Sequence, residues 1–283
     1  MLPALVHLLA CLVGFPASVE APPAPAVHGE AHVRDGTRAW TEARGHLAIV
    51  IDDIGRDLPA FERLWALPLP LTFAVLPGSR HAATIQDRLR ARPERRREVL
   101  LHLPMEPLDA TQMTAGLERD EVFLLRTDSA EVLRRKIEAA LRAVPLATGV
   151  NNHMGSRLTA DREAMEHVMT VIGERRLLFL DSRTHASSAA EDVARARGLL
   201  TSARRLFLDH DPREAAIAAR LREALQESVE RPIIVIGHPS EALVTVLERA
   251  LPALEDARVG VYPLSRIVRA HVDARLREPR SSQ

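Results

Sequence analysis

Residues 47–55 read LAIVIDDIG, in which five apolar residues lead directly into two aspartates, an isoleucine and a glycine. A short apolar run that ends in polar and turn-forming residues is typical of a strand buried on both faces of a sheet. Gly55 allows the backbone to turn sharply after the run, because glycine has no Cβ. The stretch therefore predicts a buried strand with two carboxylates, Asp52 and Asp53, at its C-terminal end.

Similar short apolar runs recur along the chain, and amphipathic helical patterns such as residues 130–143 and 161–174 lie between them. The further runs are residues 71–76, 98–103, 148–151, 177–180, 206–208, 233–236 and 259–262. Alternating strands and helices imply an α/β fold with a mostly parallel sheet. Seven or eight such units in one domain favour a closed or nearly closed barrel over an open sheet.

Length and charge set further bounds. The 283 residues, 46% of them hydrophobic, supply one large core, so we expect a single domain over residues 45–272 and a polar tail over 273–283. The 38 basic residues balance the 38 acidic ones. A protein that binds a phosphate backbone usually carries an excess of positive charge, and this chain has none. Nucleic acid is therefore not an expected partner.

The N-terminus predicts export. Residues 1–15 read MLPALVHLLACLVGF, without Lys, Arg, Asp or Glu, and resemble a secretory signal peptide. We expect residues 1–21 to be a signal peptide or N-terminal anchor, residues 22–44 to be a Pro/Ala-rich tether, and the protein to be periplasmic or in the cell envelope. Lipidation at Cys11 is the second option. Removal of the segment would leave no cysteine, which excludes disulfides and thiol catalysis.

Polar residues recur where the predicted strands end, at the rim where parallel barrels carry their chemistry. They are Asp52, His102, Asn152, Asp181, Asp209 and His238. Of the adjacent carboxylates Asp52 and Asp53, one can bind a cation while the other accepts a proton, provided that the turn brings both round. A plain turn with a helix N-cap explains the pair equally well.

Two further peptides offer metal ligands. His102 and Glu106 can reach one point if the loop between them coils, although a core histidine is the better interpretation of this peptide alone. Residues 151–157 read NNHMGSR, a polar loop that is costly to order without partners. Turn chemistry explains its asparagines and glycine but not His153 and Arg157. At the seventh strand end His238 could act as a general acid, because the unperturbed pKa of a histidine lies near neutrality.

Taken together, VIDDIG, FAVLPGS, LLHLPMEP, GVNNHMGSRLTAD, FLDSRT, FLDHD and IGHP, in this order, resemble the divergent polysaccharide deacetylase family. The resemblance runs from about residue 47 to residue 266. It implies the distorted (β/α) barrel of the NodB-related carbohydrate deacetylases, with seven or eight mostly parallel strands.

The resemblance also implies roles. Asp52 would be the catalytic base, Asp53 a metal ligand and His238 the general acid. The superfamily's second motif has two histidines four residues apart, and here the second position is Glu106. His102 and His153 then complete the ligand set, and Glu106 ligates the metal or orients a ligand. The residues expected to bind substrate or support the site are Glu106, Asn152, Ser156, Arg157, Asp181 and Arg183.

The implied reaction is metal-assisted hydrolysis of an N-acetyl or other acyl group on an envelope glycan. Zinc is the expected ion because two imidazoles favour a borderline metal over a hard one. Aromatic residues make up only 3% of the chain, and Trp40 and Trp65 lie away from the rim, which gives extended glycan binding little support.

Two other functions stay open. One is a non-catalytic or regulatory envelope protein that retains the metal site, which the altered second motif makes a serious alternative. The other is metal-free glycoside hydrolysis by Asp52 paired with Asp181 or Asp209.

Overall fold

The computed structural model describes residues 36–95, 97–113 and 121–277. The predicted signal segment and most of the predicted tether lie outside the described residues. Within them, no helix is long and apolar enough to cross a membrane.

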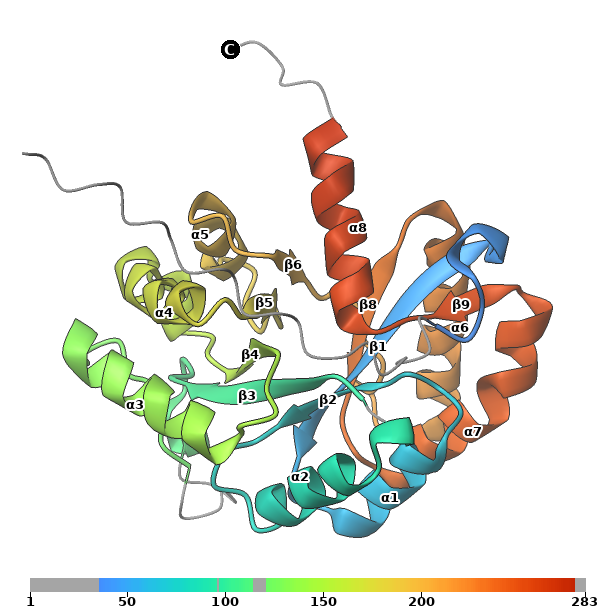
Figure 1. Cartoon of the computed structure of the whole chain (residues 1–283), viewed down its shortest axis with the longest axis horizontal. Helices are drawn as coiled ribbons and strands as arrows, with labels where there is room; N and C mark the ends of the chain where they lie inside the picture. The colour runs from blue at the N-terminus through green and yellow to red at the C-terminus, as the bar shows by residue number, and fades with distance from the viewer. Residues whose placement is uncertain (1–35, 96, 114–120, 278–283) are drawn as a thin grey trace, which may run out of the picture. The chain divides into compact units, whose positions relative to one another are not determined.

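A parallel sheet curls through the centre of the domain in the order β6-β5-β4-β3-β2-β1-β8-β7, and β9 pairs with β1 beside this path (Figure 1). The strands are β1 (Gly45–Ile54), β2 (Thr72–Val75), β3 (Val99–Met105), β4 (Gly149–Met154), β5 (Leu178–Asp181), β6 (Thr201–Ala203), β7 (Leu206–Phe207), β8 (Ile233–Gly237) and β9 (Val259–Val261). Since the strand order begins with β6 and ends with β7, the barrel is distorted and incompletely closed. The predicted fold is confirmed. The sequence missed only β6, because its residues Thr-Ser-Ala form no apolar run.

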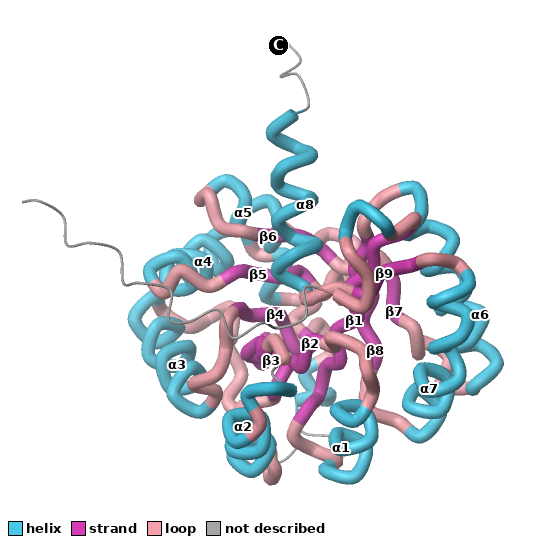
Figure 2. Tube along the Cα trace, turned by 45° about the vertical axis from the view of Figure 1, so that its right-hand side comes forward, coloured by secondary structure: helices cyan, strands magenta, loops and turns pink. Residues whose placement is uncertain are grey.

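Helices connect and cover the strands, as Figure 2 shows in cyan around the magenta sheet. They are α1 (Leu58–Ala66), α2 (Ala82–Ala91), α3 (Ala130–Ala143), α4 (Arg162–Glu174), α5 (Ala190–Ala196), α6 (Glu214–Glu230), α7 (Glu241–Asp256) and α8 (Leu264–Arg277). Side-chain oxygens cap several N-termini. Asp57 caps α1, Ser129 α3, Asp161 α4 and Ser240 α7, each by accepting a backbone N–H. Such caps satisfy donors that the first helical turn leaves unpaired.

The two faces of the sheet bury separate hydrophobic clusters. Leu47, Ile49 and Ile51 of β1 pack in the outer cluster, which also holds the buried sides of α1 to α7. Ala48 and Val50 pack in the inner cluster with the first residues of α8. Successive side chains of a strand point to opposite faces, which explains this alternation. Helix α8 thus fills part of the inner face, and the carboxyl ends of the strands remain for polar residues.

The described part of the predicted tether contacts the domain. Thr37 donates its backbone N–H to Val261 O at 2.9 Å and accepts the Val261 N–H on its hydroxyl at 3.0 Å. The Trp40 ring lies 3.9 Å from the His46 ring and 4.8 Å from the Tyr262 ring, centroid to centroid. Residues 36–44 therefore pack against β9 and the start of β1.

Candidate metal and catalytic site

Strand alternation brings the polar strand ends to one place. Val50, Leu100 and Ile236 all belong to the inner cluster. The residues two positions further along these strands are Asp52, His102 and His238. Since side chains two apart share a face, the three point to the same inner rim at the carboxyl ends of β1, β3 and β8.

An irregularity at the end of β1 brings the second carboxylate to the same side. The pairing of β1 with β2 shifts register between Ile51 and Ile54. Within that shift Asp53 has φ of 53°, in the left-handed region. An extended chain would send Asp52 and Asp53 to opposite faces, and the turned backbone at Asp53 removes this separation. The turn therefore brings both carboxylates to the same side of the sheet, as the sequence-based hypothesis of a paired site requires.

Three ligand atoms converge beside this turn. Asp53 Oδ1 lies 3.1 Å from His153 Nδ1 and 3.3 Å from His102 Nε2, and the two ring nitrogens are 3.1 Å apart. Both histidines are buried, with 2% and 6% of their surface exposed. The three residues form a group that could hold a metal ion.

Asn151 contacts both Asp52 and His102. Its Nδ2 donates to Asp52 Oδ1 at 2.8 Å, and because a carboxylate only accepts, this contact orients the amide. The amide oxygen then faces His102 Nδ1 at 3.0 Å. Nδ1 must carry the proton to donate to this oxygen. His102 therefore presents Nε2, with its lone pair, to Asp53 and His153.

The pKa values of the three ligand candidates follow from burial and mutual charge. Burial acts to raise the pKa of Asp53, but the adjacent His102 and His153 imidazoles hold it well below its usual value. Burial lowers the pKa of His153, which favours its neutral form. Burial also opposes the charged form of His102, yet the nearby Asp52 and Asp53 carboxylates raise its pKa. Any proton on His102 Nε2 would have to leave before a cation could bind at that atom.

The residues present fit a divalent cation. Among the described residues, buried Asp53 Oδ1 and His153 Nε2 have no hydrogen-bond partner, a costly arrangement for a purely structural cluster. Three donors held about 2.05 Å from a tetrahedral ion lie about 3.3 Å apart, close to the separations here. One carboxylate and two imidazoles leaving an open position is also a ligand set that zinc takes in catalytic sites.

His238 and Asp209 form a hydrogen-bonded pair on this rim. Asp209 accepts the His238 backbone N–H at 2.6 Å, and its Oδ1 lies 3.2 Å from His238 Nδ1. Burial acts to lower the pKa of His238, but the hydrogen bond to Asp209 and the charges of Asp52 and Asp53 raise it to about 9. His238 is therefore protonated at neutral pH, with Nδ1 bonded and Nε2 left to donate.

We expect His238 in the metal-free protein to titrate near pH 9 rather than near 6.5, as measured by NMR of the imidazole. Because the folded pKa is raised, the stabilisation is present below about pH 6.5 and is lost as pH rises through about 9. Asp209→Asn should move the pKa back toward 6.5. Asp211→Asn, which removes an exposed carboxylate paired with Arg213, should leave it unchanged. A wild-type pKa near 6.5 would contradict the pairing.

The structure does not bring Glu106 to the cluster. Strand β3 continues through Met105, and four residues at about 3.3 Å each separate Glu106 from His102 by about 13 Å along the strand. Glu106 accepts the Arg126 backbone N–H at 2.6 Å and lies 3.5 Å from Arg157 Nε. It therefore holds the loop that follows β3, because the coil assumed from the sequence does not form.

The remaining predicted residues do not join the metal-ligand candidates and instead form hydrogen bonds or ion pairs with neighbouring segments. Asn152 accepts the Ser182 backbone N–H at 2.8 Å and donates to Met154 O. Asp181 shares the outer face with Phe179 and is bonded to the Ser188 hydroxyl and the Arg183 N–H. Three other predicted residues contact neighbouring loops and helices. Ser156 accepts the Leu108 backbone N–H, and Arg157 donates to Leu108 O. Arg183 pairs with Glu191.

The sequence missed Arg56 and Glu121. Arg56 donates to Asp53 Oδ2 at 2.8 Å and to Glu121 Oε1 at 2.7 Å. Glu121 Oε2 lies 4.0 Å from His153 Nε2. Glu121 follows no predicted strand and gave no signal, whereas Arg56 stands directly after the IDDIG turn and could have been suspected from its place.

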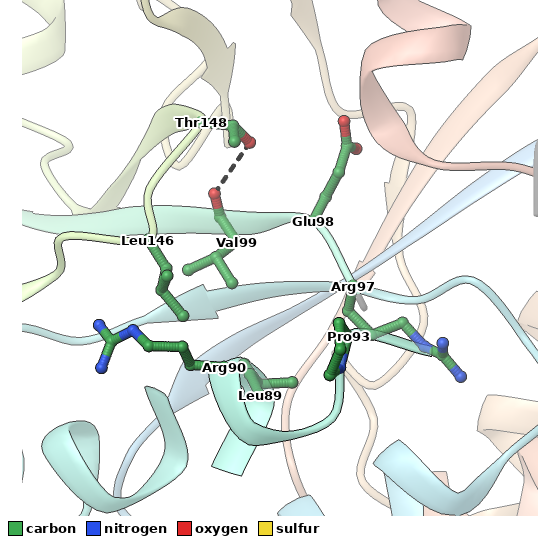
Figure 3. A pocket seen from close by; sticks show the side chains of 8 residues that line it. All are labelled: Leu89, Arg90, Pro93, Arg97, Glu98, Val99, Leu146 and Thr148. Atoms are coloured by element: carbon green, nitrogen blue, oxygen red, sulfur yellow. Dashed lines mark hydrogen bonds between the residues drawn. The ribbon is translucent and has the colours of Figure 1, made fainter. Parts of the chain in front are cut away.

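Figure 3 shows a pocket beside Val99, at the amino end of β3. The residues that line it are Leu89, Arg90, Pro93, Arg97, Glu98, Val99, Leu146 and Thr148. Glu98 precedes β3 and accepts the Ser265 N–H at 2.9 Å, which anchors the start of α8. The amino ends of barrel strands usually serve stability, and we assign this pocket no chemistry.

Comparisons with known proteins agree with this architecture. The sequence model of a family described as divergent polysaccharide deacetylase matches residues 49–268. An uncharacterized protein of Haemophilus influenzae is 33% identical over 77% of this chain and 75% of its own length. YibQ of Escherichia coli, also uncharacterized, is 35% identical over 72% of this chain and 62% of its own length. A crystal structure of an uncharacterized Agrobacterium tumefaciens protein has a TM-score of 0.71 at 25% identity, covering 81% of this chain and 91% of that one.

Proposed function

This chain belongs to the divergent polysaccharide deacetylase family, and from this premise we propose that it is an exported, metal-dependent hydrolase that removes N-acetyl or other acyl groups from an envelope carbohydrate. The observation that carries the proposal is the meeting of Asp53, His102 and His153 within reach of one ion, with Asp52 and His238 on the same rim. Export rests on the apolar sequence of residues 1–15.

Asp53, His102 and His153 would hold the cation, with zinc the favoured ion because two donors are imidazoles. When bound, the cation would polarise the acyl carbonyl and acidify the attacking water. The low pKa of Asp53 and the neutral state of His153 suit both side chains to ligation near neutral pH.

Asp52 would take the proton of the attacking water. Asn151 Nδ2 occupies Asp52 Oδ1, and Asp52 Oδ2 lies 3.7 Å from His102 Nε2, beside the ligand cluster. Since Asn151 holds only one oxygen in place, the other can accept a proton without disturbing the orientation of the carboxylate.

His238 would protonate the leaving amine. Asp209 holds Nδ1 and keeps the imidazole charged, so Nε2–H is the donor available to the substrate. The amide nitrogen takes this proton as the C–N bond breaks, which leaves a free amine and a carboxylate.

The test is acetate release by the purified protein from N-acetylglucosamine oligomers and from peptidoglycan. We expect acetate release to stop on incubation with EDTA and to return with added zinc, because the proposed reaction needs the cation that Asp53, His102 and His153 would hold. A metal-loaded protein that releases no acyl group from either substrate would contradict the proposal.

A non-catalytic envelope protein that retains the metal site is the second candidate, favoured by the departure at Glu106 from the superfamily's second motif. Such a protein would bind zinc in the same assay without hydrolysis. Glycoside hydrolysis has less support, because Asp209 is bonded to His238 and Asp181 to Ser188, so neither is free to pair with Asp52.

A further inference from the structure

Glu121 is a buried carboxylate that lies beside His153, one of the three candidate metal ligands, and belongs to none of the strands. Its side chain is 1% exposed. Oε1 accepts a hydrogen bond from Arg56 Nη2 at 2.7 Å, while Oε2 has no hydrogen-bond partner in the described part of the chain. A buried carboxylate oxygen without a donor is costly, so this arrangement calls for a partner.

His153 offers the matching donor. Its Nδ1 faces the cluster, 3.1 Å from both Asp53 Oδ1 and His102 Nε2. Its Nε2 is buried, also lacks a hydrogen-bond partner among the described residues, and lies 4.0 Å from Glu121 Oε2. The two unpartnered atoms therefore face each other across a gap longer than a hydrogen bond.

We propose that Glu121 is the positioning residue of His153 and accepts the Nε2–H when Nδ1 holds a divalent cation. A neutral imidazole that ligates through Nδ1 carries its only proton on Nε2, and that buried proton needs an acceptor. Metal-bound histidines commonly donate their second N–H to a carboxylate, which fixes the ring and strengthens it as a ligand. This inference rests on the metal site of the proposed function.

Glu121 supports the site without joining the ligand set. Glu121 approaches His153 Nε2, whereas His153 Nδ1 is the atom next to Asp53 and His102. The group of candidate ligands among the described residues does not include Glu121. Arg56 ties the support to the ligands, since its guanidinium bonds both Asp53 Oδ2 and Glu121 Oε1. One arginine thus holds a ligand carboxylate and a supporting carboxylate in fixed relation.

The test measures zinc affinity of the purified full chain after metal removal, by competition with a chromophoric chelator at fixed pH. Glu121→Ala and Glu121→Met both remove the acceptor, and Met keeps most of the volume. We expect each to bind zinc about 10–100-fold more weakly. Glu121→Gln keeps an oxygen that can accept the N–H and should bind more tightly than either. Glu131→Gln, a control that removes an exposed carboxylate paired with Arg135 on α3, should match wild type.

The visible absorption of the cobalt-substituted protein gives a second readout, because its bands report ligand geometry. We expect altered bands in Glu121→Ala and Glu121→Met and near wild-type bands in Glu121→Gln. Wild-type zinc affinity and bands in a folded Glu121→Ala or Glu121→Met variant would overturn this inference alone, as would a Glu121→Gln variant as weak as Glu121→Met. Wild-type protein that binds no zinc would overturn the metal site itself.

Discussion

Asp52→Asn is expected to lower the rate of acyl release about 10²–10⁴-fold, the usual contribution of a positioned general base. The substitution keeps the shape of the side chain but removes its ability to take a proton. Since Asp52 is not among the three converging ligand candidates, zinc affinity should stay close to the wild-type value. The measurements are acetate release under saturating zinc and a zinc titration of the same preparation.

The matched control for Asp52 is Asp87→Asn. Asp87 is an exposed carboxylate on α2 that pairs with Arg90, and its loss should leave both activity and zinc binding unchanged. Full activity in Asp52→Asn would remove Asp52 from the reaction. A simultaneous loss of zinc would instead make Asp52 part of the ligand set and would require a different base.

His102→Gln and His153→Gln are expected to abolish stoichiometric zinc binding and to reduce activity to that of EDTA-treated wild type. Each substitution removes one of two imidazole donors from the three ligand candidates that the described residues supply. Zinc at 100 times its dissociation constant should stabilise wild type by about 2.7 kcal/mol. That gain, measured as zinc-dependent thermal unfolding, should disappear in both variants.

His167→Gln serves as the control, because His167 is exposed on α4 and, within the described part of the chain, belongs to no group of candidate metal ligands. It should keep both the bound zinc and the zinc-dependent shift in unfolding temperature. Equimolar, tightly held zinc in His102→Gln would place the metal elsewhere in the chain.

Local sequence patterns predicted most of the fold. The apolar run at residues 47–51 identified β1, and similar runs identified seven further strands, because buried parallel strands leave continuous apolar stretches. Strand β6 escaped because its Thr201 and Ser202 are buried polar residues, which carry no hydrophobic signal. The polar residues at the strand ends could also be predicted, because each of them follows closely on an apolar run.

The site itself was only partly predictable. The sequence named Asp53, His102 and His153, but their convergence depends on the positive φ at Asp53 and on the pairing of β3 with β4, which no local pattern encodes. Glu106 was misplaced because four residues of strand span far more distance than four residues of coil. Glu121 was missed because its approach to His153 depends entirely on tertiary structure.

The position of β1 in the sheet also bears on how the chain is made. The first strand finds its partners β8 and β9 near the other end of the chain, with Leu47 beside Ile233 and Gly45 beside Val259. The inner cluster also needs α8, the last helix described. Contacts between distant parts of a sequence form slowly. A growing chain can therefore pair β1 only with the nearby β2 until residues 233–277 have been made, so the central strand of the sheet completes its pairing late in folding.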